Sequence, residues 1–244
     1  MISDRPTPPA APVLPPEEHD APGVRRPSRL LWAAAVLAGL IALALAGSML
    51  TDAAPYGWDR AILLSLRVPG DTAQPIGPGW LHHAMVAITA LGDGTILTMV
   101  VVGVSGLLLV RRLALTAGLV LVATASGALI AAQAKFWFGR PRPELVAHLV
   151  DASGLSFPSG HATNSAIVYL TLAGLVSQVE HGRAVRRYLL ALAIFLVGAI
   201  GTSRVYLGVH WPSDVLAGWS LGTLWALGWW GIAAWIRHRE NVIR

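Results

Sequence analysis

The amino-acid sequence predicts an all-α, polytopic membrane protein with six transmembrane helices. Of its 244 residues 55% are hydrophobic and only 13% are charged, which is too apolar for an ordinary soluble domain. Several apolar runs approach or exceed the roughly 20 residues that a helix needs to cross a bilayer. Cysteine is absent, which excludes disulfides and thiolate metal sites. The net charge of +5 comes with no basic cluster interleaved with aromatic residues, so no nucleic-acid partner is predicted.

The first transmembrane helix is predicted at residues 30–50. Residues 1–29, rich in proline, alanine and charge, have little with which to build a core, and we expect a disordered cytoplasmic tail there. A cleaved signal peptide is the alternative, because residues 44–46 resemble a cleavage site. The apolar run is longer than a typical signal core, which favours a retained helix.

The segment that follows, residues 51–80, is predicted to be a loop. It carries charged residues, prolines and glycines, with a short amphipathic helix expected around Trp58–Leu66 at the membrane interface. Residues 91–94 open or interrupt the second span, and Asp93 is expected near a helix N-terminus, where a carboxylate caps well.

Four further spans complete the predicted domain of residues 30–236. The second span ends at two arginines and the third begins at once, so these two helices form a tightly linked antiparallel pair. A charged turn is expected at 180–187, and residues 237–244 are expected to be a cytoplasmic tail. The predicted third to sixth spans are 113–136, 158–179, 188–206 and 214–236.

The distribution of arginine predicts the orientation in the membrane. Most arginines fall in the tails and in the links after the second and fourth spans, and positively charged segments stay on the cytoplasmic side. We therefore expect a multi-pass protein of the cell (inner) membrane, with both termini cytoplasmic and the opposite loops extracytoplasmic.

Three polar segments interrupt the apolar sequence between residues 135 and 214. The first polar segment is Lys135–Pro143, the second is Pro158–His161 and the third is Ser203–Asp214. Their spacings are K-x6-R-P, P-S-G-H and S-R-x5-H-x3-D, and all three are predicted to emerge on the extracytoplasmic side. Three motifs in this order are far more specific than any one alone. The chain resembles membrane members of the type 2 phosphatidic acid phosphatase (PAP2) superfamily, which also includes vanadium haloperoxidases; the resemblance implies a PAP2/haloperoxidase-like helical core.

The cations of these segments are suited to binding phosphate. Lys135, Arg142, Arg204 and His161 lie near membrane depth, where charge is costly and indicates function. Arginine offers a planar fork of donors to tetrahedral oxyanions, and lysine a compact charge. Arg140 falls in the variable gap of the motif, and we expect it to be an accessory contact at most.

The second polar segment precedes a predicted helix. Backbone N–H groups at a helix start favour an anion, Gly160 permits close approach, and Ser159 can cap the helix or donate to phosphate. The helix dipole disfavours the imidazolium of His161, which ligand charge would offset, so this histidine is poised to act as a general acid.

The third polar segment pairs a histidine with a carboxylate. Pro212 suits the first position of a helix, which places Asp214 in the first turn and His210 just outside it. From there the carboxylate can fix the imidazole tautomer and leave the other nitrogen unprotonated.

The family resemblance implies a role for each of these residues. His210 would attack phosphorus and form a phosphohistidine, Asp214 would orient it, and His161 would protonate the leaving oxygen. No metal or other cofactor is expected, because positioning and charge stabilisation supply most of what phosphoryl transfer needs. The groups expected to stabilise the equatorial phosphate oxygens are Lys135, Arg142, Ser159, Gly160 and Arg204.

The leading hypothesis is a metal-independent phosphatase that acts on a lipid phosphate or diphosphate in the bilayer. Undecaprenyl diphosphate is the first expectation, and phosphatidic acid, phosphatidylglycerol phosphate and lipid A phosphate remain open. The motifs do not separate water from an alcohol as acceptor, so a lipid phosphotransferase is the main alternative. A vanadium haloperoxidase, and a transporter or structural membrane protein with a vestigial site, are more remote. The sequence predicts nothing about the oligomeric state.

Overall fold

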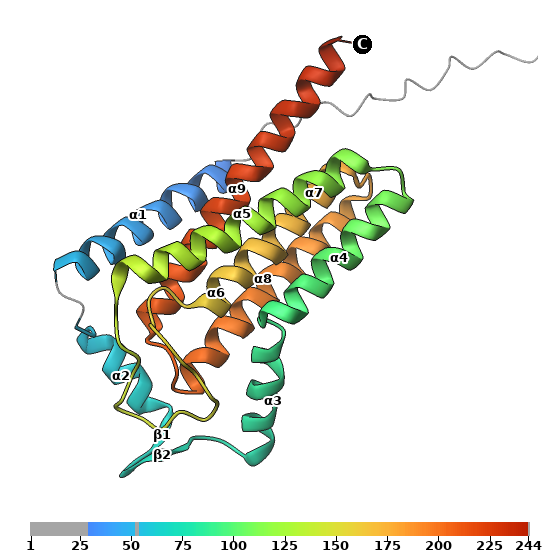
Figure 1. Ribbon diagram of the computed structural model, residues 1–244. Helices are drawn as coiled ribbons and strands as arrows, with labels where there is room; N and C mark the ends of the chain where they lie inside the picture. The colour runs from blue at the N-terminus through green and yellow to red at the C-terminus, as the bar shows by residue number, and fades with distance from the viewer. Residues whose placement is uncertain (1–28, 52–53, 244) are drawn as a thin grey trace, which may run out of the picture.

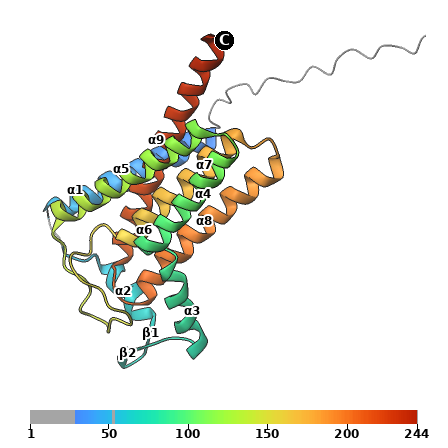
Figure 2. The same cartoon turned by 45° about the vertical axis from the view of Figure 1, so that its right-hand side comes forward.

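The protein is a bundle of helices, and the elements of residues 57–90 lie together at one end of it (Figures 1 and 2). The computed structural model describes residues 29–51 and 54–243, so all of the predicted tail at 1–29 except Arg29 lies outside the described residues. The elements are α1 (Arg29–Thr51), α2 (Gly57–Ser65), β1 (Arg67–Val68), β2 (Asp71–Pro75), α3 (Gly79–Ala90), α4 (Gly94–Val110), α5 (Ala114–Phe138), α6 (Gly160–Ser165), a π-helical segment η1 (Ala166–Leu170), α7 (Thr171–Val179), α8 (Arg183–Tyr206) and α9 (Pro212–Ile243).

The prediction of an all-α fold is confirmed. Within the described residues the only strands are β1 and β2, an antiparallel pair in the segment predicted to be a loop. The short helix expected there is present as α2. Asp93 caps α4 as predicted, because its carboxylate accepts a hydrogen bond from Thr95 N at 2.8 Å.

Fewer than six helices of the described residues meet a length and hydropathy test for crossing a membrane. Three do: α5, the continuous run Gly160–Val179 and α8. A fourth is present if α3 and α4, which meet at a bend of 54°, form one broken span. In α1 the apolar stretch is shorter, Ala35–Ala46. The structure therefore supports three or four candidate spans, not clearly the six that were predicted.

Two helix boundaries differ from those predicted. The expected charged turn at 180–187 is mostly helical, since α8 begins at Arg183; arginine is a good helix former, so charge alone does not mark a turn. Helix α9 begins at Pro212 as expected but continues to Ile243, through most of the predicted tail.

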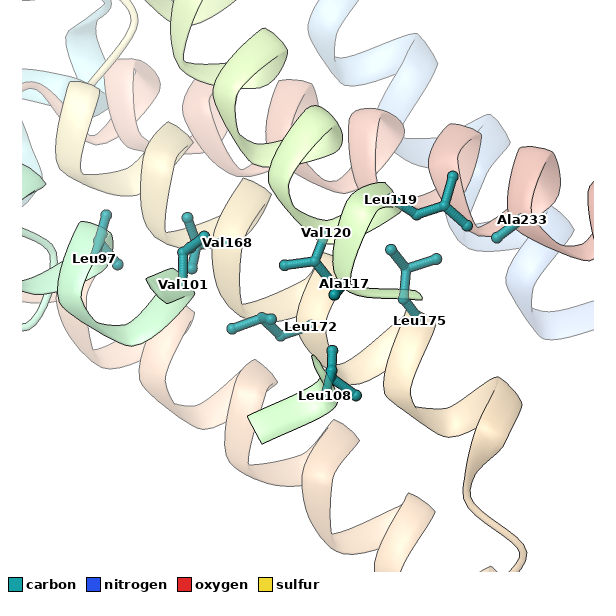
Figure 3. Close-up of a cluster of buried hydrophobic side chains, with 10 residues drawn as sticks. All are labelled: Leu97, Val101, Leu108, Ala117, Leu119, Val120, Val168, Leu172, Leu175 and Ala233. Atoms are coloured by element: carbon teal, nitrogen blue, oxygen red, sulfur yellow. The ribbon is translucent and has the colours of Figure 1, made fainter. Parts of the chain in front are cut away.

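The core lies in the middle of the bundle, where α4, α5, η1, α7 and α9 meet. A cluster of buried aliphatic side chains fills this region (Figure 3). On the outer surface of the bundle, by contrast, large apolar side chains such as Val110, Phe136 and Phe195 are exposed. Large exposed apolar surface indicates contact with lipid, in agreement with the candidate spans. The members of the cluster are Leu97, Val101, Leu108, Ala117, Leu119, Val120, Val168, Leu172, Leu175 and Ala233.

Close packing of α9 on α6 brings the second and third polar segments together. A Cβ at Gly218 would lie only 2.8 Å from Thr163 Oγ1 and 2.9 Å from Ser159 O, so a larger residue there would force the helices apart. At the end of α5, Gly139 adopts a left-handed conformation with φ 58°, which turns the chain into the long connection between α5 and α6. That connection crosses the end of the bundle near α2 and the strands (Figure 1).

Candidate active site

The three polar segments meet at this end of the bundle. Ser159 N donates a hydrogen bond to Asp214 O at 3.0 Å, which joins the second segment to the third. Arg142 Nη1 lies 3.2 Å from His210 Nε2, which joins the first to the third. Lys135 packs against Gly160, where a Cβ would lie 3.3 Å from the ammonium nitrogen. All three segments therefore contribute to one cluster.

His210 is buried in the link between α8 and α9, and its contacts define its tautomer. Its Nδ1 lies 3.4 Å from Asp214 Oδ2, which also accepts from Trp211 N at 2.9 Å. The guanidinium of Arg142 can only donate, so Nε2 accepts from it and carries the lone pair. The proton is therefore on Nδ1, directed at the carboxylate, and Nε2 is the nitrogen available to react.

Burial keeps the imidazole of His210 neutral. Desolvation is the main cause that lowers its pKa from the ordinary 6.5 to about 4; the charges of Arg142 and Arg204 act in the same direction and Asp214 opposes them. At neutral pH Nε2 is therefore unprotonated, as a nucleophile requires.

His161 lies in the first turn of α6 and faces the same cluster. Its imidazole is within electrostatic range of His210, Arg204, Lys135 and Asp93. Its ring packs against the link between α3 and α4, where a Cβ at Gly92 would lie 3.2 Å from its Cδ2. The two histidines predicted to share the chemistry thus lie in one site.

The predicted phosphate ligands are held mainly by backbone oxygens. Arg142 donates to the carbonyls of Ser153 at 2.8 Å and Val209 at 2.7 Å. Lys135 has only a long contact, 3.5 Å, to Leu155 O. Arg204 donates from Nη1 to Thr89 Oγ1 at 3.0 Å.

Two polar atoms of this cluster are buried without a hydrogen-bond partner: Arg204 Nε and Ser159 Oγ. Ser159 precedes α6 but makes no side-chain cap, so the capping role considered for it is wrong, and its hydroxyl is free to donate elsewhere. Buried donors left unpaired are costly and uncommon, and an anion placed between them would satisfy both.

Arg140, expected to be an accessory contact at most, has a role in the structure that the sequence did not indicate. Rather than an accessory contact, its side chain is fully buried between two carboxylates, 2.6 Å from Asp214 Oδ1 and 3.1 Å from Asp59 Oδ2. It also donates to Ser213 Oγ at 2.8 Å. The motif spacing gave no sign of this, because Asp59 lies 81 residues earlier in the chain.

Sequence reasoning also missed Asp59, Ser213 and Thr89. Asp59 was one of several charged residues in a predicted loop, and nothing in the sequence distinguished it from its neighbours. Ser213 lies inside the H-x3-D motif, so its position next to Asp214 was the one available signal. The described residues contain no group of three or more His, Asp or Glu side chains that could hold a metal ion.

Comparison with known proteins agrees with this cluster. Residues 116–238, which contain the three polar segments, match the family model described as PAP2 superfamily. The chain belongs to the PAP2 superfamily. The family predicted from the three motifs is confirmed, and the protein is an enzyme of the phosphatase type that hydrolyses phosphate esters. Its apolar helices and its similarity to a transmembrane structure make it a membrane protein.

Three relatives illustrate the range of this PAP2 similarity. Phosphatidylglycerophosphatase B of Bacillus subtilis is 36% identical over 146 residues, which are 59% of this chain and 71% of the relative. Undecaprenyl-diphosphatase of Sulfolobus acidocaldarius is 41% identical over 68 residues, 28% of this chain and 29% of the relative. The crystal structure of a transmembrane PAP2-type phosphatidylglycerolphosphate phosphatase from Bacillus subtilis has a TM-score of 0.68 and 30% identity, covering 83% of this chain and 94% of that chain.

Proposed function

We propose that this protein hydrolyses a phosphate or diphosphate on a lipid headgroup through a phosphohistidine on His210. The observation that carries the proposal is the pair of buried, unpaired donors, Arg204 Nε and Ser159 Oγ, in the same cluster as the unprotonated Nε2 of His210. A phosphoryl group would satisfy both donors while its phosphorus faces the nucleophile.

In the first step, Nε2 of His210 attacks phosphorus in line. A P–N bond forms as the P–O bond to the lipid breaks, and His161 gives its proton to the leaving oxygen. Asp214 holds Nδ1–H of His210, which keeps the ring oriented and stabilises the positive charge that develops on it. Arg142, which donates to Nε2 in the free enzyme, turns its N–H to a phosphate oxygen when the substrate is bound.

In the second step, water attacks the phosphohistidine. His161, now neutral, takes a proton from the water as the new P–O bond forms and the P–N bond breaks, which releases phosphate and restores both histidines. Lys135, Arg142 and Arg204 stabilise the charge on the equatorial oxygens in both steps, together with Ser159 and the backbone N–H of Gly160.

The membrane arrangement that fits this role has six spans. Helix α1 has 23 residues and α9 has 32, each sufficient to cross a bilayer core of about 30 Å, and both run along the bundle (Figure 1). With the pair α3 and α4, α5, residues 160–179 and α8 they make six. The distribution of arginine favours cytoplasmic termini and an extracytoplasmic site.

Cysteine labelling tests this orientation, because the chain has no cysteine of its own. In the variant Asp151→Cys, we expect the new thiol to react with a membrane-impermeant maleimide added to intact cells. Labelling that occurs only after lysis would indicate the opposite orientation.

Two lipids are the leading substrates. The longer of the two alignments reported above is with a protein named for phosphatidylglycerol phosphate, and this favours that monoester. Undecaprenyl diphosphate, the first expectation from the sequence, is supported by the shorter alignment. A site at one end of the bundle is compatible with either lipid, since a headgroup can reach that end while the tail stays in the bilayer.

Phosphate release from purified protein tests the proposal. The assay uses detergent and EDTA with phosphatidylglycerol phosphate, phosphatidic acid, undecaprenyl diphosphate and lipid A phosphate. We expect release from at least one lipid and its loss, by roughly 10⁴-fold or more, in His210→Ala. Transfer of label to a second lipid without free phosphate would instead indicate a phosphotransferase. Release that His210→Ala leaves unchanged would contradict the mechanism.

A further inference from the structure

Four buried polar side chains, one of them Asp214, form a hydrogen-bonded group next to His210. Arg140, Asp59, Ser213 and Asp214 are all fully buried. Arg140 comes from the α5–α6 connection, Asp59 from the first turn of α2, and the other two from the first turn of α9. The mechanism above uses only Asp214, so the other three have no role in it yet.

The two oxygens of Asp214 are divided between this group and His210. Oδ1 accepts from Arg140 Nη1 at 2.6 Å, the shortest of its contacts. Oδ2 accepts from Trp211 N at 2.9 Å and contacts His210 Nδ1 at 3.4 Å. The orientation of the carboxylate towards the imidazole is therefore fixed from its other side by Arg140.

Asp59 in turn fixes Arg140 and the start of α9. Its Oδ2 accepts from Arg140 Nη2 at 3.1 Å and from Ser213 Oγ at 2.7 Å, and its Oδ1 accepts from Ser213 N at 2.9 Å. Ser213 immediately precedes Asp214, so these bonds hold the backbone as well as the side chain. The guanidinium also lies over the ring of Trp211, 5.6 Å from its centroid.

We propose that Arg140 and Asp59 are positioning residues for the proposed phosphatase reaction: Arg140, held by Asp59, sets both the orientation and the effective charge of Asp214, and through it the reactivity of His210. This inference rests on the proposed function. Asp59 lies outside residues 116–238, so the short helix α2 becomes part of the catalytic apparatus although it lies beyond the matched family region.

The charges of this group predict changes in the pKa of His210 that a purely structural role of Arg140 and Asp59 would not cause. In the folded protein Arg140 neutralises one of two carboxylates, which leaves a net charge of −1 beside His210. Arg140→Met leaves two uncompensated carboxylates, so the imidazolium is favoured and the pKa of His210 rises from about 4. Asp59→Asn removes one negative charge, so Arg140 neutralises Asp214 and the pKa of His210 falls. The other charges acting on His210 are Arg142 and Arg204, and its coupling to His161 is unchanged in both variants.

The experiment combines kinetics with a histidine titration. Turnover of dioctanoyl phosphatidic acid in dodecyl maltoside gives kcat and KM, and nitrogen chemical shifts of labelled histidine against pH give the His210 pKa, assigned with His210→Gln. We expect Arg140→Met to lower kcat by roughly 100-fold with KM changed less than about threefold, because a displaced nucleophile loses rate more than binding. Arg140→Lys should recover part of kcat. The control variants are Arg183→Met and Asp71→Asn, both exposed, which should match the wild type.

Opposite pKa shifts in Arg140→Met and Asp59→Asn support the inference. If the wild type turns over and His210→Ala does not, while both variants keep the wild-type kcat and titration, the inference is wrong and the proposed function stands. If the wild type shows no turnover, the proposed function fails, and the titration still decides whether Arg140 tunes His210. If Arg140→Met does not fold, Asp59→Asn, which preserves side-chain shape, decides: an unchanged kcat and titration there would overturn the inference.

Discussion

The cations on the two sides of the His210–Asp214 pair have different kinds of partners. On the closed side, formed by Arg140, Asp59 and Ser213, the guanidinium lies between two carboxylates. On the open side, formed by Lys135, Arg142 and Arg204, none of the three cations makes an ion pair with a carboxylate of the described residues. These three contact carbonyls, a hydroxyl and a neutral imidazole instead.

This difference in partners suits the closed side to stabilising the fold and the open side to binding the substrate of the proposed function. Buried charge is stable only when paired and hydrogen-bonded, and the closed side meets that condition within the protein. The open side does not, and in the proposed function the negative charge that completes it comes from the phosphate of the substrate. Both sides act on one imidazole, and changing each should therefore have different consequences.

Of the changes that distinguish the two sides, removing a cation from the open side should have the largest effect on activity. Arg204→Gln deletes a donor aimed at the phosphoryl group, and we expect kcat/KM to fall by roughly 10²–10³-fold, as for loss of one oxyanion donor. Stability should not fall, since the change relieves repulsion between neighbouring cations. Phosphate-release kinetics and a thermal unfolding midpoint, measured on the same preparation, check both parts. A large loss of stability would place Arg204 with the structural group.

Removing the cation from the closed side should lower the stability of the protein as well as kcat, whereas a change on the open side should lower activity alone. Arg140→Ala leaves Asp59 and Asp214 buried without their counter-ion, and breaking such a pair costs about 3–5 kcal/mol. Denaturant unfolding in detergent micelles measures the change, with Arg183→Ala as a matched exposed control. A loss below about 1 kcal/mol would mean that the carboxylates find other partners, and the contrast between the two sides would disappear.

The smallest expected effect is a shift in the pH profile. In the proposed mechanism the neutral form of His210 is the reactive one, and its pKa is lowered to about 4, so the imidazole stays unprotonated well below pH 6.5. The acid limb of kcat/KM that belongs to His210 should therefore lie near pH 4. Arg204→Gln removes one charge that lowers this pKa, so its limb should move to higher pH. A limb of the wild type near 6.5 that moves with His210 variants would contradict the effect of burial.

The open side could be predicted from the sequence and the closed side could not. Lys135, Arg142 and Arg204 occupy fixed positions in the three motifs, and Pro212 marked the start of α9, so the placement of His210 and Asp214 relative to that helix followed from local rules. Arg140 and Asp59 meet through tertiary packing across 81 residues, and no spacing or periodicity records such a contact. Thr89 and Arg204, 115 residues apart, are a second example.

Helix boundaries show the same limit. Capping by Asp93 and an opening or interruption of the second span at residues 91–94 depend on adjacent residues and were expected. The size of the bend there, 54°, and the extension of α9 were not. By helix length and hydropathy, the described residues give three or four candidate spans, whereas the sequence predicted six. In α9 much of the apolar content is tryptophan and glycine, which pack well but contribute little to hydropathy.

Trapping the covalent intermediate tests the central claim most directly. Purified His161→Ala, mixed with ³²P-labelled lipid phosphate and quenched in alkali, should retain acid-labile label, because the first step still produces a phosphohistidine and its hydrolysis has lost the general base. Peptide mapping should place that label on His210, and His161→Ala/His210→Ala should carry none. Label on another residue, or turnover by the wild type with no phosphohistidine at any quench time, would contradict the account.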